Sequence, residues 1–319
     1  MKLVILERDT YGNDIDFDAL EALVDEVVAY PVTAQEDVAR RVQDADFVLV
    51  NKLLMQKSSL SGAKNLKLLL EGATGYNNID LDYVRSRGLG AANVAGYSVQ
   101  IVPQHTFALY LSLSEHIAHF DHYVKSGAYS RSGVFSHFMP SFTELEGKTW
   151  GIVGLGNIGK RVARIAEAFG CRVIYYSTSG RNNNPDYAQV DFDTLLKESD
   201  VVSIHAPLNT DTKGLFNAAA FAKMKPSAVL INVGRGPIVD EPALVDALNN
   251  GQIAGAGLDV METEPLPADS PLFNVKDPDK LLMTPHMAWA SVEARQRLVN
   301  EVALNLKAFL RGERRNRVD

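Results

Sequence analysis

Three side chains in the second half of this chain could together bind a carboxylate and move a proton: Arg235, Glu264 and His286. The planar guanidinium group of an arginine can bind a carboxylate through two hydrogen bonds. A histidine exchanges a proton near neutral pH, and a neighbouring carboxylate orients it and favours its charged form. Taken singly, each of the three would be interpreted as structural.

The position of these residues along the chain makes them a set. Each follows an apolar run that predicts a buried strand, and helix-like patterns separate the runs. Alternation of this kind indicates a parallel sheet with helices on its faces. Because the carboxyl ends of parallel strands meet at one edge, we expect the three side chains to converge on the crevice where such a sheet binds its ligand.

A glycine motif predicts what that ligand is. Residues 154–159 read G-x-G-x-x-G, between an apolar run at residues 150–153 and a helix-like pattern that stops at Gly170. A second apolar run at residues 173–176 completes a strand–turn–helix–strand unit of about 30 residues, as the dinucleotide-binding fingerprint requires. The alternative is a glycine-rich corner that binds nothing.

Each glycine of the motif meets a different requirement of a dinucleotide. Gly154 permits the tight turn, Gly156 lets a pyrophosphate approach the backbone, and Gly159 lets the helix pack close to the strand. Asn157 and Ile158 lie at the start of the same helix, whose free N–H groups and positive end bind phosphate. We therefore predict that these five residues bind the cofactor.

Composition excludes several other classes of protein. The 319 residues are 46% hydrophobic and 22% charged, and the net charge of −7 speaks against a nucleic-acid surface. No apolar run approaches the ~20 residues of a membrane span. The single cysteine, Cys171, excludes an internal disulfide and fits the reducing cytoplasm. Its place at the entrance to a strand predicts that it is buried packing.

The length suggests two domains. The first part of the chain also alternates, with strands predicted at residues 3–6 and 47–50 and a helix at residues 17–28, but it carries no phosphate-binding glycine pattern. Two long helices are predicted at residues 98–125 and 291–311. The last helix has no sheet of its own to cover, so we expect it to return to the first domain.

We therefore predict an α/β fold of two Rossmann-like parallel-sheet domains, with a cleft between them where ligands bind. Residues 1–98 and 288–319 would form a flavodoxin-like, substrate-binding domain. Residues 99–287 would form the dinucleotide-binding Rossmann domain. The chain would then cross from one domain to the other twice.

In the order and spacing of its motifs, the full chain resembles the D-isomer-specific 2-hydroxyacid dehydrogenase family. The motifs are the glycines at 154–159, Asn232–Gly236, Gly257–Val260 with Glu264–Pro265, and Thr284–His286. The resemblance implies that Arg235 binds the carboxylate and carbonyl of a substrate, that His286 is the general acid and base, and that Glu264 is the partner of His286. It further implies that Asp259 and Thr106 contact the nicotinamide side of the cofactor, and that Ala206 and Pro207 lie beside the adenosine.

The resemblance also assigns residues of the first domain. Residues 73–80 match the family loop whose backbone amides, here those of Thr74 and Gly75, take the substrate carboxylate. Asn51-Lys52 is similar to a pair in the glycerate dehydrogenase and hydroxypyruvate reductase branch of the family. Lys52 is therefore either a substrate contact or a surface lysine.

The implied reaction is reversible hydride transfer between NAD(P)H and a small 2-oxo acid such as hydroxypyruvate or glyoxylate, giving the D-2-hydroxy acid. The alternative among enzymes is another specificity of the family, for D-lactate, phosphoglycerate or formate. The alternative outside enzymes is a dinucleotide-sensing binding protein, because the family includes a transcriptional corepressor. The complete Arg–Glu–His set and the lack of a long disordered tail favour catalysis. The resemblance also implies a homodimer formed through the cofactor domain.

The choice between NAD and NADP depends on the end of the second strand of the dinucleotide unit. NAD enzymes usually place an acid there to hold the ribose 2′-OH, but this chain has Ser177, with Arg181 close by. A serine with an arginine can accept a 2′-phosphate, whereas a carboxylate would repel it. We expect NAD(H) or NADP(H) to serve, with NADP slightly favoured; the alternative is a solvated Arg181 and an NAD enzyme.

No metal site is predicted. His116, His119 and His122 recur every three residues, and two histidines at that spacing on a helix could share a zinc ion. Three at this spacing drift around the helix, however, so we interpret them as a polar helix surface.

Overall fold

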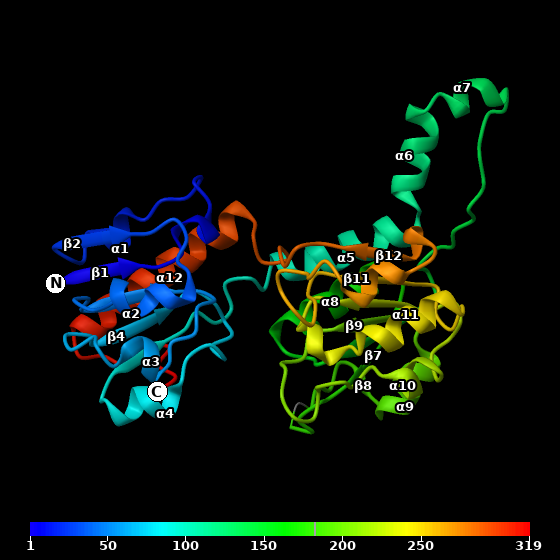
Figure 1. The fold of residues 1–319 in the computed structure, drawn as a ribbon. Helices are drawn as coiled ribbons and strands as arrows, with labels where there is room; N and C mark the ends of the chain where they lie inside the picture. Colours follow the sequence, from blue (N-terminus) through cyan, green and yellow to red (C-terminus); the bar gives the residue numbers. More distant parts are fainter. Residues whose placement is uncertain (182) are drawn as a thin grey trace. The chain divides into compact units, whose positions relative to one another are not determined.

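The chain forms two compact units in a computed structural model that describes residues 1–181 and 183–319 (Figure 1). Unit 1 consists of Met1–Ser98 and Ala290–Asp319, and unit 2 of Val99–Trp289. Unit 1 is thus built from both ends of the chain, and unit 2 is its continuous middle.

A five-stranded, fully parallel sheet forms the centre of unit 1, in the order β2-β1-β3-β4-β5. The strands are β1 (Lys2–Ile5), β2 (Glu26–Ala29), β3 (Phe47–Val50), β4 (Leu68–Glu71) and β5 (Gly90–Ala92). All residues of β3 and β4 are buried, which explains their continuous apolar runs. The order is that of a flavodoxin-like sheet, in which the direction of winding reverses between β1 and β3.

Short helices and one long helix complete unit 1. They are α1 (Asp18–Glu21), α2 (Val38–Arg41), α3 (Lys57–Leu60), α4 (Leu81–Ser86) and α12 (Val292–Leu310), with 3-10 turns η1 (Arg8–Tyr11) and η2 (Gln35–Asp37). The hydroxyl of Ser291 caps α12, and the helix packs against α1 and β4. The predicted return of the last helix to the first part of the chain is confirmed.

The helix predicted at residues 17–28 is wrong over its second half. Only α1 forms, and residues 26–29 make β2, which pairs with β1 along its whole length. Val27 and Val28 are β-branched and half-buried, so an edge strand suits them better than a helix turn.

A seven-stranded, fully parallel sheet forms the centre of unit 2, in the order β12-β11-β10-β9-β6-β7-β8. The strands are β6 (Thr149–Val153), β7 (Arg172–Tyr176), β8 (Ala188–Gln189), β9 (Val201–Ile204), β10 (Val229–Asn232), β11 (Gly255–Leu258) and β12 (Leu281–Met283). Winding reverses between β6 and β9, which is where a doubly wound sheet binds its ligand. The predicted pair of parallel-sheet α/β domains is confirmed.

Helices cover both faces of this sheet. They are α5 (Ile101–Ser114), α6 (Ile117–Lys125), α7 (Ala128–Ser132), α8 (Asn157–Ala168), α9 (Phe192–Glu198), α10 (Ala218–Phe221) and α11 (Glu241–Asn249), with 3-10 turns η3 (Gly236–Ile238), η4 (Pro271–Asn274) and η5 (Pro278–Lys280). Successive side chains of a strand point to opposite faces, so the sheet has a core on each side.

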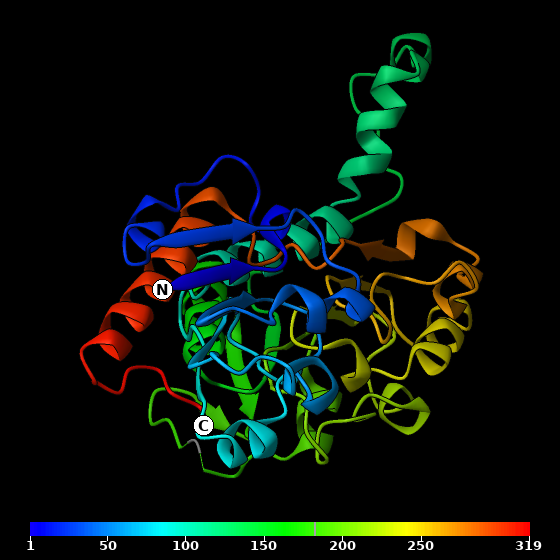
Figure 2. The same cartoon turned by 60° about the vertical axis from the view of Figure 1, so that its left-hand side comes forward.

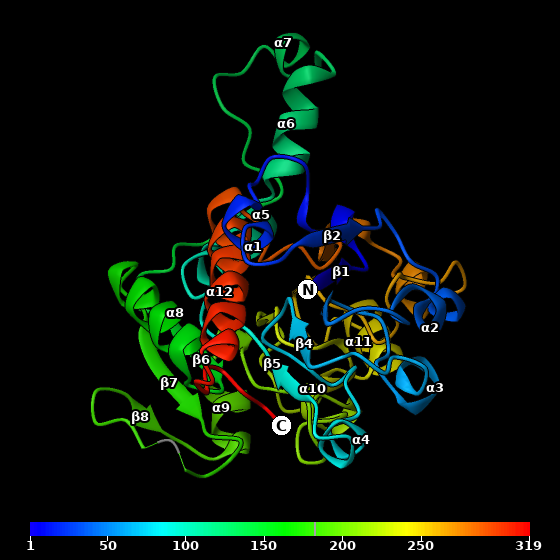
Figure 3. The same ribbon diagram turned by 90° about the vertical axis from the view of Figure 1, so that its left-hand side faces the viewer.

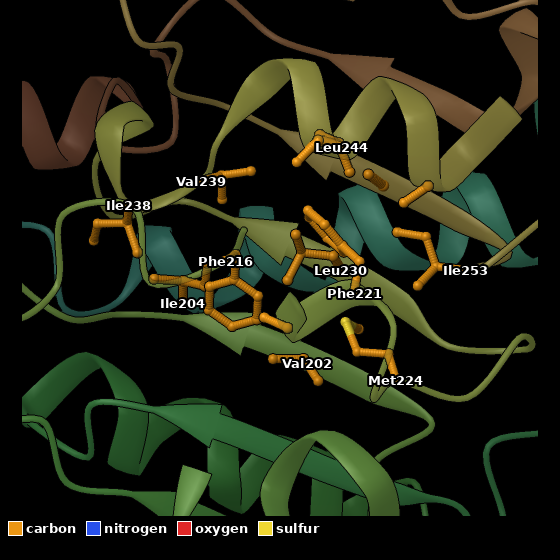
Figure 4. Packing of buried hydrophobic residues seen from close by; sticks show 14 of the residues in the cluster. Val202, Ile204, Phe216, Phe221, Met224, Leu230, Ile238, Val239, Leu244 and Ile253 are labelled. Atoms are coloured by element: carbon orange, nitrogen blue, oxygen red, sulfur yellow. The ribbon is translucent and has the colours of Figure 1, made fainter. Parts of the chain in front are cut away.

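The two cores fix the helices that carry the site. On one face Val202 and Leu230 pack with Phe221 and Leu244 of α10 and α11 (Figure 4). On the other face Trp150 is fully buried against α5 and α8, and α8 lies along β6 and β7 (Figure 3). The Cys171 thiol belongs to this second core, where burial raises its pKa to about 11, so its predicted packing role is confirmed.

The single helix predicted at residues 98–125 is wrong, because the structure breaks it into α5 and α6. His116 at the break has φ +52°, a left-handed conformation that an α-helix cannot contain. Half of α5 is buried in unit 2, whereas α6 has no buried residue. With α7, α6 forms an arm that stands clear of the rest of unit 2 (Figure 2).

The length and apolar character of the helices were compared with what a membrane span requires. Within residues 1–181 and 183–319, none is both long enough and apolar enough to span a bilayer.

Candidate active site

The glycine turn lies at the point where the unit 2 sheet reverses its winding. Gly154 follows β6 with φ +92°, and a Cβ there would stand 2.9 Å from the backbone nitrogen of Ala206, which follows β9. A Cβ on Gly159 would meet the carbonyl oxygen of Gly154. Both glycines are therefore required by packing within the protein, which brings the turn and the start of α8 together.

Gly156 differs, because the protein itself does not require it. Its φ is −77°, and a Cβ built on it meets no protein atom within 4 Å. It is the N-cap of α8 and offers no side chain to the helix, so the first N–H groups of α8 remain available to a phosphate. The open space beside Gly156 is a cradle that a Cβ would partly fill, and it fits a dinucleotide pyrophosphate.

Ser177 stands at the end of β7, where the sequence predicted it. It is buried, and its Oγ has no hydrogen-bond partner among the residues that the structure describes. A buried hydroxyl without a partner is costly and suits a bound ligand group. Arg181, four residues on, is exposed.

Of three further residues that the family resemblance assigns to the cofactor, Ala206 and Thr106 are buried in unit 2 and Pro207 is exposed. Ala206 closes against Gly154, and Pro207 accepts a hydrogen bond from Thr212 through its carbonyl oxygen. Thr106 is fully buried in α5, and its hydroxyl donates to the Val102 carbonyl oxygen at 2.8 Å.

The loop after β10 presents Arg235. Asn232, fully buried at the end of β10, holds the loop by donating to the Arg235 carbonyl oxygen and accepting from the Gly234 amide, both at 3.0 Å. The guanidinium group donates to the Gly234 carbonyl oxygen at 2.8 Å. In the described part of the chain it makes no ion pair, so its remaining N–H groups can bind a carboxylate.

His286 and Glu264 form a pair. The imidazole Nδ1 lies 2.6 Å from Glu264 Oε2, and the side chains are 23% and 31% exposed. The other carboxylate oxygen accepts from the Met261 amide at 3.0 Å, which fixes its direction. With Nδ1 engaged, Nε2 of His286 is the atom left to exchange a proton with a substrate.

The loops that carry Arg235 and Glu264 pack on each other. A Cβ on Gly236 would collide with the backbone of Met261, so only a glycine allows this contact. The strands before them, β10, β11 and β12, are neighbours in register, with Asn232 beside Leu258 and Leu258 beside Met283. The structure thus brings the three predicted catalytic residues to the carboxyl ends of adjacent strands.

A different histidine, His205, is excluded from proton transfer. It lies partly buried after β9, and burial lowers its pKa to about 3, so it stays neutral at physiological pH. Its Nε2 lies 3.0 Å from Ser203 Oγ, which also accepts from the Trp150 indole. His205 is structural.

Lys52 and its neighbours follow β3, at the winding reversal of the unit 1 sheet. The Glu7 carboxylate accepts from the backbone amides of Asn51 and Lys52, at 2.8 and 3.0 Å. Glu71, at the end of β4, is fully buried; burial raises its pKa well above the usual value, against the hydrogen bond from Asn78 and the charge of Lys52. The backbone of Lys52 is thus fixed beside two acidic residues, while its side chain is exposed.

The Thr74–Gly75 loop of unit 1 has a fixed backbone. Asn93 donates to the Thr74 carbonyl oxygen at 2.7 Å, and the Thr74 hydroxyl donates to the Val94 carbonyl oxygen at 2.8 Å. Asn305 of α12 donates in turn to the Asn93 carbonyl oxygen. The final helix thus buttresses this loop.

Several of these supporting residues were not predicted from sequence. Glu7 and Asn93 carry polar groups at strand ends, which is the one signal that could have singled them out. Their partners lie far along the chain, so no local spacing identifies them.

Metal ligation finds no support in the structure. Over residues 1–181 and 183–319, no group of three or more His, Cys, Asp or Glu side chains could hold an ion. His119 faces Asp279 at 4.0 Å, while His116 occupies the helix break.

Known proteins are similar to this chain over most or all of its length. Residues 107–288 match the model of the D-isomer specific 2-hydroxyacid dehydrogenase, NAD binding domain. Hydroxypyruvate reductase of Blautia hydrogenotrophica is 36% identical over 318 residues, 98% of each chain, and glycerate dehydrogenase of Methylorubrum extorquens is 37% identical over 284 residues, covering 89% of this chain and 88% of the relative. The solved acyclic imino acid reductase Bsp5, in complex with NADPH and D-Arg, is 30% identical over 100% of both chains with a TM-score of 0.88.

The chain belongs to the D-isomer-specific 2-hydroxyacid dehydrogenase family. It is an oxidoreductase, and unit 2 is its NAD(P)-binding domain.

The two glycines of the turn give a paired prediction. Gly156→Ala should lower stability less than Gly159→Ala does, because the new methyl group meets no protein atom and only the weaker N-cap preference of alanine opposes it, yet it should weaken NAD(P)H binding at least tenfold. Gly159→Ala should lower stability by about 1–3 kcal/mol, the usual cost of overpacking. Thermal melts and fluorescence titration with both cofactors measure the effects. Unchanged cofactor affinity in Gly156→Ala would show that the pyrophosphate binds elsewhere.

Proposed function

We propose that this enzyme transfers a hydride reversibly between NAD(P)H and a small 2-oxo acid of the hydroxypyruvate or glyoxylate type, giving the D-2-hydroxy acid. The observation that carries the proposal is the 2.6 Å contact of His286 with Glu264 in the dinucleotide unit. Names of relatives support the substrate class, since two of them are a hydroxypyruvate reductase and a glycerate dehydrogenase.

Each catalytic residue has a defined task in this reaction. The dinucleotide supplies the hydride to carbon C2 of the oxo acid. Arg235 binds the carboxylate and polarises the carbonyl as negative charge grows on its oxygen. His286 donates a proton from Nε2 to that oxygen, and Glu264 holds the imidazole by Nδ1 and favours its charged form. In the reverse direction His286 takes the proton back.

The proposal also assigns substrate contacts to residues of unit 1. The backbone amides of Thr74 and Gly75 bind the substrate carboxylate, and Lys52 contacts the substrate. The support is their placement: Lys52 follows β3 at the winding reversal, and Asn93 and Asn305 fix the Thr74 loop. D-Lactate, phosphoglycerate or formate specificity is the enzymatic alternative, and a dinucleotide-sensing binding protein the other; the engaged His286–Glu264 pair favours catalysis.

Removing the proposed acid tests the reaction. His286→Ala should lower kcat for hydroxypyruvate reduction at least a hundredfold, since general acid catalysis contributes roughly 10²–10⁴. His119→Ala, on the exposed arm, is the matched control and should retain full activity. A kcat within threefold of the wild type in His286→Ala would refute the assignment.

The cofactor proposal is that NADPH is accepted alongside NADH and slightly favoured. Its support is the missing acid after β7, the unpartnered buried Ser177 hydroxyl and the nearby Arg181. We further propose that the cofactor is contacted by Thr106, Asn157, Ile158 and Asp259, and its adenosine by Ala206 and Pro207.

A panel of 2-oxo acids assayed with both cofactors tests substrate and cofactor together. We expect hydroxypyruvate or glyoxylate to give the highest kcat/KM, with NADPH at least equal to NADH. Ser177→Asp should reverse the preference, because a carboxylate repels the 2′-phosphate and holds the ribose hydroxyl. A hundredfold preference of the wild type for NADH would contradict the cofactor proposal.

The exposed arm supports a homodimer. Several large apolar side chains of the arm and of the segment that follows α7 are exposed, among them Ile117 at 52%, Phe138 at 77% and Phe135 at 93%. Tyr123 stacks on His137 with ring centroids 4.2 Å apart. A hollow of about 300 Å³ at the base of the arm is lined by Tyr110, Phe142 and other residues. Because arm and hollow lie on one unit, two copies related by a twofold axis can cover both.

The buried single cysteine fits a cytoplasmic enzyme.

Light scattering after size exclusion tests the dimer. The wild type should be dimeric, and Phe135→Asp with Phe138→Asp should be monomeric at micromolar concentration, because a charge cannot be buried in an apolar interface. Phe273→Asp, at an exposed phenylalanine outside the arm, should remain dimeric. A monomeric wild type would overturn the proposal.

A further inference from the structure

The loop that carries His286 is organised by one buried carboxylate, that of Asp259. This residue is 1% exposed, and its Oδ1 accepts from the Thr284 hydroxyl at 2.6 Å and from the Met287 amide at 2.8 Å. Its Oδ2 accepts from the Ala288 amide at 2.8 Å. Asp259 thus binds residues on both sides of His286.

These bonds matter because His286 has an unfavourable backbone conformation. Its φ is +52°, which a residue with a side chain seldom adopts and which persists only when the surroundings impose it. The His286 amide donates to the Asp259 carbonyl oxygen at 2.8 Å. Main chain and side chain of Asp259 together therefore impose the conformation that places the imidazole on Glu264.

His105 of α5 is the outer member of this network. Its Nε2 lies 3.0 Å from Thr284 Oγ1 and 3.5 Å from Asp259 Oδ1. The Thr284 hydroxyl has one proton, which it donates to Asp259. Since the hydroxyl oxygen must then act as acceptor toward His105, Nε2 of His105 carries a proton and donates it.

We propose that His105 is a positioning residue for the general acid. By donating to Thr284 it fixes the hydroxyl toward Asp259, and Asp259 then holds the amides around His286 in the geometry that proton transfer requires. The inference rests on the proposed catalytic role of His286. His105 is thus a residue beyond Arg235, Glu264 and His286. It lies on α5, where only Thr106 was predicted to have a role.

The electrostatics of the network agree with this role. Burial would raise the pKa of Asp259, but the hydrogen bonds from His105, Thr284 and the two amides outweigh burial and lower it. Asp259 is therefore a buried anion, and the bonds that hold the loop are charge-assisted. The position of α5 does not depend on His105, because Phe107 stacks on Trp150 with ring centroids 4.5 Å apart. Loss of the His105 bond should thus leave unit 2 folded.

Substitution of His105 separates positioning from structure. His105→Leu removes the donor at similar volume and should lower kcat at least tenfold, since small displacements of a catalytic group cost up to about a hundredfold. His105→Gln, which keeps a nitrogen donor, should restore most of the activity.

Thr284→Val gives an independent test of the same chain of bonds. It should reproduce the effect of His105→Leu, and the double variant should lose no more activity than the worse single one, because both act through one path. A His105→Leu enzyme with kcat within twofold of the wild type would overturn the proposal, whatever its melting temperature. His286→Ala in the same assay distinguishes failure of the proposed function from failure of the His105 proposal. Full activity of His286→Ala would refute the proposed function itself.

Discussion

The active site depends on a buried anion held by directed hydrogen bonds. Asp259 has almost no exposure, so its charge is tolerable only because a hydroxyl and two backbone amides donate to it. The same bonds force His286 into a left-handed conformation. Asp259 thereby serves both the stability of the loop and the proposed catalysis. The loop cannot relax without leaving a buried charge short of hydrogen-bond donors.

The parallel sheets determine where such residues can gather. Every strand of both sheets runs in the same direction, so polar residues after the strands collect at one edge of each sheet. In unit 2 that edge carries the glycine turn, Arg235, Glu264 and His286. In unit 1 it carries Lys52, whose backbone amide is held by Glu7. The packed cores hold the strands in place, and the strand ends in turn position the residues of the site.

The parallel sheets, and the positions of the three residues proposed as catalytic, could be predicted from the sequence because both follow local rules. Strand and helix alternate visibly, and the glycines, Arg235, Glu264 and His286 stand at fixed offsets from apolar runs. The break at His116 and the strand at residues 26–29 were missed, since apolar periodicity continues through both while tertiary packing decides the outcome. His105 and Thr284 were missed for another reason: they are 179 residues apart, and no local pattern joins them.

Isotope tracing tests the central claim, hydride transfer to a 2-oxo acid in the unit 2 site, most directly. Hydroxypyruvate would be reduced with NADPH or NADH carrying deuterium at both C4 positions, and the product examined by mass spectrometry and chiral chromatography. Hydride transfer to C2 predicts D-glycerate with one deuterium on C2. Product without deuterium, L-glycerate, or no reduction of any 2-oxo acid in the panel would contradict it.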